Sequence, residues 1–280
     1  MPAKPAWSPW PALRRFGINL FGAASEPIYR LYERRLLAEV LEHPAPGHVG
    51  IILDGNRRYG QRRGFTDTAE LYALGARKLD DVLDWCGELA IPAVTLWVCS
   101  TENLSRPPDE ISGILAAVEA KLLSLVDNPQ IHRRRVRVKT IGRLELLPER
   151  TVAALNAACQ ATAGYDGMIL TIAIAYGGHE EIVDAVRALL DEEAARGLTL
   201  REAIDGVTPK AISAHLYAAG VPDPDLIIRT SGEIRLSGFL LWQSAHSEFY
   251  FSDVFWPAFR KIDFLRAVRA FQQRQRRFGQ

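Results

Sequence analysis

The chain has 280 residues, 48% of them hydrophobic and 24% charged, with a formal net charge of +1 at pH 7. This length and composition allow one substantial buried core and do not demand a second domain. The near-neutral charge gives no general reason to expect a nucleic-acid partner, and the three cysteines lack the paired spacing of a metal site or a disulfide framework, so we expect a reduced cytoplasmic protein.

The first 25 residues are predicted to be a tail that precedes the folded part of the chain. Residues 7–21 mix tryptophan, phenylalanine and isoleucine with Arg14 and Arg15, a composition suited to a membrane interface. Pro9 and Pro11 interrupt a helix at its start, however, and favour a self-packed or poorly ordered tail. No segment is apolar over a bilayer-spanning length, and no secretory signal is present. The composition of residues 7–21 keeps open peripheral contact of the N terminus with the inner face of the membrane.

Strand-like and helix-like stretches alternate along the rest of the chain. Short apolar runs predict strands at 48–53, 93–99, 136–141, 168–175, 225–229 and 248–251. Apolar residues at helical spacing predict helices at 75–90, 108–126, 148–162, 179–195, 208–219 and 262–276. This alternation indicates a single α/β domain with a central, mostly parallel six-stranded sheet flanked by helices. Ligands of such folds bind beyond the carboxyl ends of the strands.

The first strand runs directly into a polar segment, and residues 48–58 read HVGIILDGNRR. Asp54 offers a hard oxygen ligand for Mg2+, and Gly55 lets the backbone approach a phosphate closely. Arg57, Arg58 and the first amides of a following helix can neutralise phosphate oxygens. By itself an Asp-Gly-Asn sequence is more often an ordinary turn.

Two further strands also end in polar segments with arginines. Residues 100–107 read STENLSRP, and residues 229–237 read RTSGEIRLS. Arg229, Arg235 and Ser237 could clamp a diphosphate, because arginine suits bidentate phosphate contacts. All three polar segments should emerge at one edge of the sheet and converge there.

Together with the Tyr-Gly-Gly sequence at 176–178 and the stretch 225–248, these segments resemble the cis-prenyltransferases, the family of undecaprenyl diphosphate synthase, over residues 26–279. Residues 26–33, EPIYRLYE, and the STENL form of the middle segment are most similar to the short-chain actinobacterial (2Z,6E)-farnesyl diphosphate synthases. The resemblance implies a catalytic domain over 26–280, a homodimer and a need for Mg2+.

The resemblance also implies roles for individual residues. The allylic diphosphate would lie over residues 54–58, and isopentenyl diphosphate would be held by Arg229, Arg235 and Ser237. Mg2+ would be bound by Asp54 and by Glu248, which in the family reaches the site from or near the dimer partner. Asn103 would help to remove the proton, by orienting a phosphate or water, since an amide is a poor base. Further substrate contacts are expected at Tyr59, Ser100, Thr101, Glu102, Leu104, Arg106 and Leu236.

Simpler roles remain open for some of these residues. Ser100, Thr101 and Glu102 could cap the helix that follows them, and Glu248 could be an ordinary acid near a subunit boundary.

The sequence also departs from the family pattern. Residues 65–72, FTDTAELY, lack the arginine and histidine that long-chain members carry in the loop over the allylic diphosphate, and Tyr59 and Leu104 stand where tryptophans are frequent.

The resemblance predicts Mg-dependent condensation of isopentenyl diphosphate with an allylic diphosphate, best geranyl diphosphate, to a short Z-prenyl diphosphate such as (2Z,6E)-farnesyl diphosphate, with release of diphosphate. An apolar tunnel between the helices at 75–90 and 108–126 should set product length, with Leu115 and Val118 facing it. Three alternatives stay open: a medium- or long-chain polyprenyl diphosphate synthase, an irregular lavandulyl-type synthase using dimethylallyl diphosphate, and a non-catalytic prenyltransferase subunit.

Overall fold

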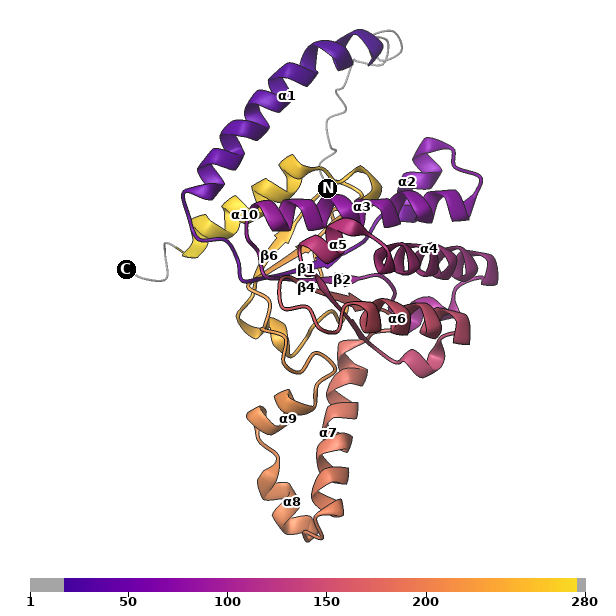
Figure 1. Cartoon of the computed structure of the whole chain (residues 1–280), viewed down its shortest axis with the longest axis vertical. Coiled ribbons are helices and arrows are strands. Elements are labelled where there is room, and N and C mark those ends of the chain that lie inside the picture. Colours follow the sequence, from indigo (N-terminus) through magenta and orange to yellow (C-terminus); the bar gives the residue numbers. More distant parts are fainter. Residues whose placement is uncertain (1–17, 276–280) are drawn as a thin grey trace, which may run out of the picture.

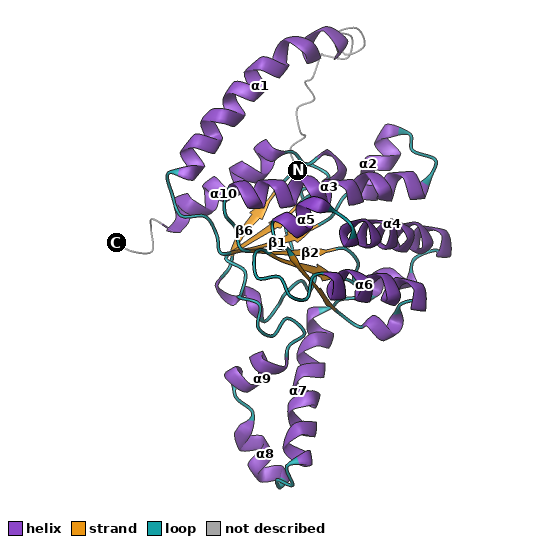
Figure 2. Cartoon of the chain, in the orientation of Figure 1, coloured by secondary structure: helices purple, strands orange, loops and turns teal. Residues whose placement is uncertain are grey.

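Six short strands form one sheet in the computed structural model, which describes residues 18–275 (Figure 1, Figure 2). All paired strands are parallel, in the order β3-β4-β2-β1-β5-β6. The predicted fold class and the six predicted strands are therefore confirmed. The strands are β1 (His48–Ile52), β2 (Ala93–Trp97), β3 (Arg137–Ile141), β4 (Ile169–Ala173), β5 (Leu226–Arg229) and β6 (Glu248–Phe251).

Every residue of β1, β2 and β5 is buried, as expected for central strands of a parallel sheet covered on both faces. His48 is a polar member of this set and is 2% exposed. Its Nδ1 donates to the Pro222 carbonyl at 2.6 Å, so its Nε2 can accept from the Thr95 hydroxyl at 2.8 Å. Burial lowers the pKa of His48, so the ring stays neutral and ties the start of β1 to its neighbours.

Helices and irregular segments cover the two faces of the sheet differently. One face carries a large core that draws on α1, α3, α4, α6 and α10. The other carries a smaller cluster in which Trp97 and Phe239 stack with ring centroids 5.3 Å apart, beside Tyr176. The helices of the described part are α1 (Ile18–Leu41), α2 (Asn56–Arg63), α3 (Thr68–Glu88), α4 (Pro108–Val126), α5 (Pro129–Arg133), α6 (Glu149–Ala161), α7 (Gly178–Ala195), α8 (Leu200–Gly206), α9 (Pro209–His215) and α10 (Lys261–Gln275).

Two helical segments extend from opposite ends of the sheet layer (Figure 1). At one end α7, α8 and α9 form an arm, and at the other the first turns of α1 project beyond α10. The second half of α1 is anchored, because Leu36 and Val40 are 1% exposed and the Gln272 side chain donates to the Val40 carbonyl at 2.9 Å. Residues 1–17, which hold most of the predicted interfacial stretch, lie outside the described residues. Among residues 18–275, no helix combines the length and apolarity needed to cross a membrane.

The helices differ from the predictions at several points. The helix predicted to begin at residue 75 begins at Thr68, because the Asp67 side chain caps it by accepting from the Ala69 amide at 2.8 Å. The helix predicted over 208–219 ends at His215. The short α8 was not predicted, although Thr199 and Glu202 form a capping box that marks its start in the sequence.

Candidate active site

The three polar segments that follow β1, β2 and β5 converge on one cavity of about 500 Å³ at the carboxyl edge of the sheet. β1 lies between β2 and β5, so the ends of three adjacent strands supply the wall. The predicted convergence is therefore present in the fold. The predicted site residues on this wall are Asp54, Gly55, Asn56, Arg57, Arg58, Ser100, Glu102, Asn103, Arg106, Arg229, Arg235 and Ser237.

Gly55 makes the tight turn between β1 and α2. Its φ of 99° is left-handed, and an added Cβ would lie 2.5 Å from the Phe255 ring, so another residue would be strained and clash. Asn56 opens α2, and its side-chain amide donates to the Leu53 carbonyl at 3.0 Å. The turn thereby holds the Asp54 carboxylate at the base of the cavity.

Two arginines bind the Asp54 carboxylate. Oδ2 accepts from Arg229 Nη2 at 2.8 Å, and Oδ1 lies 3.4 Å from Arg58 Nη2. Partial burial would raise the pKa of Asp54, but hydrogen bonding to Arg229 and Ser231 and the two positive charges outweigh it, so the pKa is lower than usual. Asp54 is therefore an ionised, hard oxygen donor at neutral pH. Such a group suits Mg2+, which binds through one or two carboxylates together with substrate phosphates.

Arg229 is the most buried of the cavity arginines, at 5% exposed. Its Nη1 donates to the Arg235 carbonyl at 2.5 Å and to the Ser237 hydroxyl at 2.9 Å. Arg229 thus fixes the loop that carries the two other residues predicted to hold a diphosphate. Its buried Nε has no hydrogen-bond partner among the residues that the structure describes.

Glu233 is a cavity residue that sequence reasoning missed, although it lies inside the RTSGEIRLS segment. Its carboxylate accepts from Arg58 at 2.8 Å and also pairs with Arg235. A carboxylate therefore bridges the two cations that a diphosphate would need. Thr230 and Ser231 were also missed: the Thr230 hydroxyl contacts the backbone of Asp54 at 2.7 and 2.9 Å, and the Ser231 hydroxyl accepts from Arg58 at 2.7 Å.

Ser100 and Asn103 form a reciprocal turn at the end of β2. The Asn103 side-chain oxygen accepts from the Ser100 amide, and the Asn103 amide donates to the Ser100 hydroxyl, each at 3.1 Å. With its oxygen engaged, Asn103 can offer the cavity its NH2 group as a donor. The geometry favours orientation of a phosphate or water by Asn103 over direct removal of a proton. Ser100 also takes part in the capping that the simpler interpretation expected.

Four predicted contact residues do not lie on the cavity wall. Tyr59 stands beside Phe65, with ring centroids 6.2 Å apart, and Arg63 lies over its ring. Thr101 lies in the turn before a short 3-10 helix, Glu102–Ser105, near Gly177. Leu104 packs against the large core and Leu236 against the small cluster. These side chains support the loops that carry the wall residues.

Glu248 lies at the opposite edge of the sheet from Asp54. It is the first residue of β6 and is level with Leu226, which pairs with Val49. Asp54 is five residues beyond Val49, or about 16 Å along the strands. Within this chain Glu248 pairs with Arg274 at 2.7 Å, and no group of three potential metal-ligating side chains occurs in the part that the structure describes. The role predicted for Glu248 as a metal ligand therefore requires a second copy of the chain.

The segment that lacks the family's arginine and histidine is mostly the first turn of α3. Asp67 caps this helix, and Leu71 is buried against Gly60. Tyr72 is on the cavity wall, and its hydroxyl donates to Glu110 at 3.1 Å. Glu110 also accepts from Arg106 at 2.8 Å. A network centred on a tyrosine and a glutamate thus occupies this side of the cavity.

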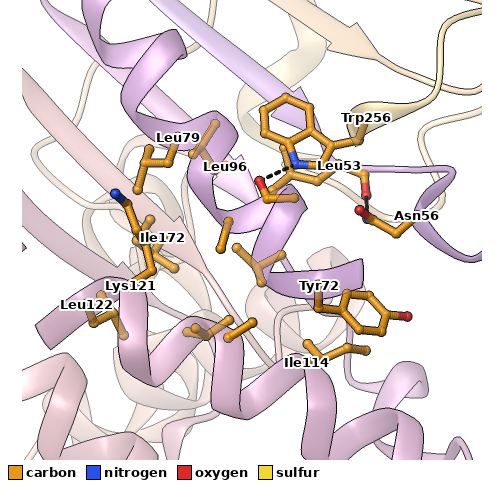
Figure 3. Close-up of a pocket in the computed structure, with 15 residues that line it drawn as sticks. Leu53, Asn56, Tyr72, Leu79, Leu96, Ile114, Lys121, Leu122, Ile172 and Trp256 are labelled. Carbon is orange, nitrogen blue, oxygen red and sulfur yellow. Dashed lines mark hydrogen bonds between the residues drawn. The ribbon is translucent and has the colours of Figure 1, made fainter. Parts of the chain in front are cut away.

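A narrow apolar cavity of about 80 Å³ adjoins the polar one and lies between α3 and α4 (Figure 3). The two cavities adjoin, because five residues belong to both walls: Leu53, Asn56, Tyr72, Val98 and Ile114. The indole of Trp256 donates to the Gly75 carbonyl at 2.9 Å and closes one side. Val118 lines this cavity as predicted. Leu115 is buried but is not on the wall, so its predicted position was wrong.

Comparison with known proteins places this site in context. The Prenyltransf family model, described as undecaprenyl diphosphate synthase, matches residues 52–279. The chain is 53% identical over 257 residues to an isoprenyl transferase of Thermus thermophilus, covering 92% of this chain and 97% of that protein. It is 51% identical over 253 residues to a (2Z,6E)-farnesyl diphosphate synthase of Thermobifida fusca, covering 90% and 97%. A crystal structure of lavandulyl diphosphate synthase from Lavandula x intermedia with dimethylallyl diphosphate matches with a TM-score of 0.75 and 31% identity, over 84% of this chain and 99% of that one.

Proposed function

Because the chain belongs to the undecaprenyl diphosphate synthase family of cis-prenyltransferases and is an isoprenyl transferase that elongates prenyl chains, we propose that it condenses isopentenyl diphosphate with geranyl diphosphate. The product is a short Z-prenyl diphosphate, (2Z,6E)-farnesyl diphosphate. The observation that carries this proposal is the junction of an arginine-lined polar cavity with a narrow apolar one. The polar cavity suits two diphosphates, and the apolar cavity suits a short tail.

In the proposed complex, the allylic diphosphate lies over the turn at residues 54–58, where the α2 amides and Arg58 face it. Isopentenyl diphosphate lies on Arg229, Arg235 and Ser237. Glu233 now bridges Arg58 and Arg235, so the incoming anions would displace its carboxylate. The arginines are held in position before substrate binds, which reduces the ordering that binding must otherwise impose.

The proposed reaction breaks the carbon-oxygen bond of the allylic diphosphate and forms a bond from its C1 to C4 of isopentenyl diphosphate. The C2 proton of isopentenyl diphosphate leaves to a phosphate oxygen or water oriented by Asn103, and diphosphate is released. Mg2+ held by Asp54 would supply charge compensation for the leaving diphosphate. Glu248 of a second copy is the proposed additional ligand, which makes a homodimer part of the proposal.

The proposed activity is tested with purified protein, Mg2+, labelled isopentenyl diphosphate and, separately, dimethylallyl, geranyl or farnesyl diphosphate, with products sized and their double-bond geometry determined. One (2Z,6E)-farnesyl product, formed fastest from geranyl diphosphate, is expected. A ladder of long products would show a polyprenyl diphosphate synthase instead. A branched product from dimethylallyl diphosphate alone would show a lavandulyl-type enzyme, and no product under any condition would point to a non-catalytic subunit.

Product length should respond to side chains on the apolar wall but not to those behind it. Val118→Ala, which widens the wall, is expected to shift much of the product to chains at least one isoprenyl unit longer. Leu115→Ala should leave product length unchanged, although the cavity left in the core should cost about 2–5 kcal/mol of stability. Product sizing and urea unfolding of both variants measure this difference. Equal lengthening in the two variants would contradict the position of the wall.

A further inference from the structure

One charged side chain belongs to the otherwise uncharged wall of the apolar cavity. This residue is Lys121 of α4, which lies with Leu122 and Ile172 at the end of the cavity remote from Asn56 and Tyr72 (Figure 3). The polar cavity adjoins at Asn56 and Tyr72, so Lys121 and Leu122 mark the opposite end. A hydrocarbon tail that enters from the polar cavity would reach Lys121 last.

An ion pair between two helices fixes the position of Lys121. Its ammonium lies 2.6 Å from both carboxylate oxygens of Asp80 on α3. The Lys121 side chain is 14% exposed and that of Asp80 is 48% exposed, so the pair lies at the protein surface. The methylene stem of Lys121 therefore lines the cavity while its charge stays near water. The pair bridges α3 and α4 at the point where the cavity ends.

The spacing of the wall residues along α3 and α4 gives the depth of the apolar cavity. Tyr72 and Leu79 on α3, and Ile114 and Leu122 on α4, are the first and last wall residues of each helix. Seven residues of α3 and eight of α4 separate these pairs, a depth of about 10–12 Å. On the next turns Leu83 and Leu125, 4% and 0% exposed, belong to the packed core and not to the wall. A longer tail would have to pass between α3 and α4 at Lys121.

We propose that Lys121, positioned by Asp80, is the stop that limits product length. This inference rests on the proposed chain-elongation function. A tail that grows past Lys121 must displace the lysine stem and separate the ion pair, or enclose the ammonium among hydrocarbon. Enclosing an unpaired ammonium is strongly unfavourable. The next elongation step therefore becomes unfavourable when the tail contacts the stem, and the product is released.

The test compares Lys121→Met with the wild-type chain in the isopentenyl diphosphate assay, with products sized. Methionine keeps an unbranched apolar side chain and removes both the charge and the link to Asp80. The main product is expected to lengthen by at least one isoprenyl unit. Asp80→Asn, a change at a half-exposed carboxylate, should shift product length in the same direction but less, because Lys121 remains. Lys78→Met is the matched control, because Lys78 pairs with Asp81 on its own helix at 2.7 Å and lies off the wall.

The outcomes separate this inference from the proposed function. Unchanged product length in Lys121→Met and Asp80→Asn proteins that still incorporate isopentenyl diphosphate would overturn the inference alone. Lengthening in Lys78→Met to the same extent would also overturn it, since a general loosening of α3 would then be the cause. A wild-type protein that forms no product from any starter would overturn the proposed function, and the inference with it.

Discussion

Replacement of Asp54 by asparagine should lower the rate of isopentenyl diphosphate incorporation by at least about 10³-fold, because this ionised group is the proposed metal ligand and fixes two arginines. The Asp54 oxygens contact Arg229 and Arg58 at 2.8 and 3.4 Å. Asparagine keeps the size of the side chain but has no charge to compensate these cations or to bind Mg2+. Initial rates at saturating substrates measure the effect. A variant that keeps a tenth of the wild-type rate would exclude Asp54 from these roles.

Glu233→Gln is the matched control for Asp54→Asn. It also removes a carboxylate that pairs with Arg58, but this one bridges the cations that the diphosphates are proposed to occupy. We expect its rate to change far less than that of Asp54→Asn. The two variants together distinguish the loss of a metal ligand from a change in the net charge of the cavity.

The pH dependence gives an independent check on Asp54. Its folded-state pKa is lower than the usual 3.8, so its stabilising contribution is present above that value and is lost as the pH falls through the folded pKa. The stability difference between wild type and Asp54→Asn should therefore be constant from pH 5 to 8 and shrink only below about pH 4. Urea unfolding of both proteins across this range measures it. A difference that already shrinks near pH 6 would mean that Asp54 lacks its arginine partners.

The sheet was predictable because its central strands are short, largely apolar runs between polar segments. β1, β2 and β5 are buried along their whole length, and such runs are not readily mistaken for amphipathic helices. Once a parallel sheet is assumed, the position of the site follows, because Asp54, Ser100 and the segment that begins at Arg229 must meet at the carboxyl edge. Local sequence and topology were sufficient to predict this part of the site.

The positions of other site residues depend on which side of a helix, or which edge of the sheet, they occupy. The spacing of residues in the sequence did not determine these positions. Leu115 and Val118 are three residues apart on α4 and both are buried, yet only Val118 lines the apolar cavity. Glu233 carried no signal in the sequence, because its partner Arg58 lies 175 positions away in the chain. Glu248 follows the third polar segment in sequence, but the return to β6 carries it to the opposite edge of the sheet.

Arg229→Ala should lose both activity and stability, because Arg229 holds the site together and is a proposed contact of isopentenyl diphosphate. The guanidinium joins Asp54, the Arg235 carbonyl and the Ser237 hydroxyl, and it is 5% exposed. Removing one partner of a buried ion pair typically costs about 3–5 kcal/mol. We expect kcat/KM for isopentenyl diphosphate to fall by about 10²–10³-fold or more, as for the loss of a preorganised donor. Steady-state kinetics and urea unfolding measure the two losses.

Two further variants separate binding from support of the loop. The side chain of Arg235 is 60% exposed, so Arg235→Ala should raise KM for isopentenyl diphosphate with little change in stability. Arg229→Lys should not rescue activity, because an ammonium cannot reproduce the planar fork that reaches all three acceptors. If Arg229→Lys were fully active, charge alone would explain the role of Arg229. If Arg235→Ala were as destabilised as Arg229→Ala, the loop would depend on Arg235, and the assignment of Arg229 as its anchor would be wrong.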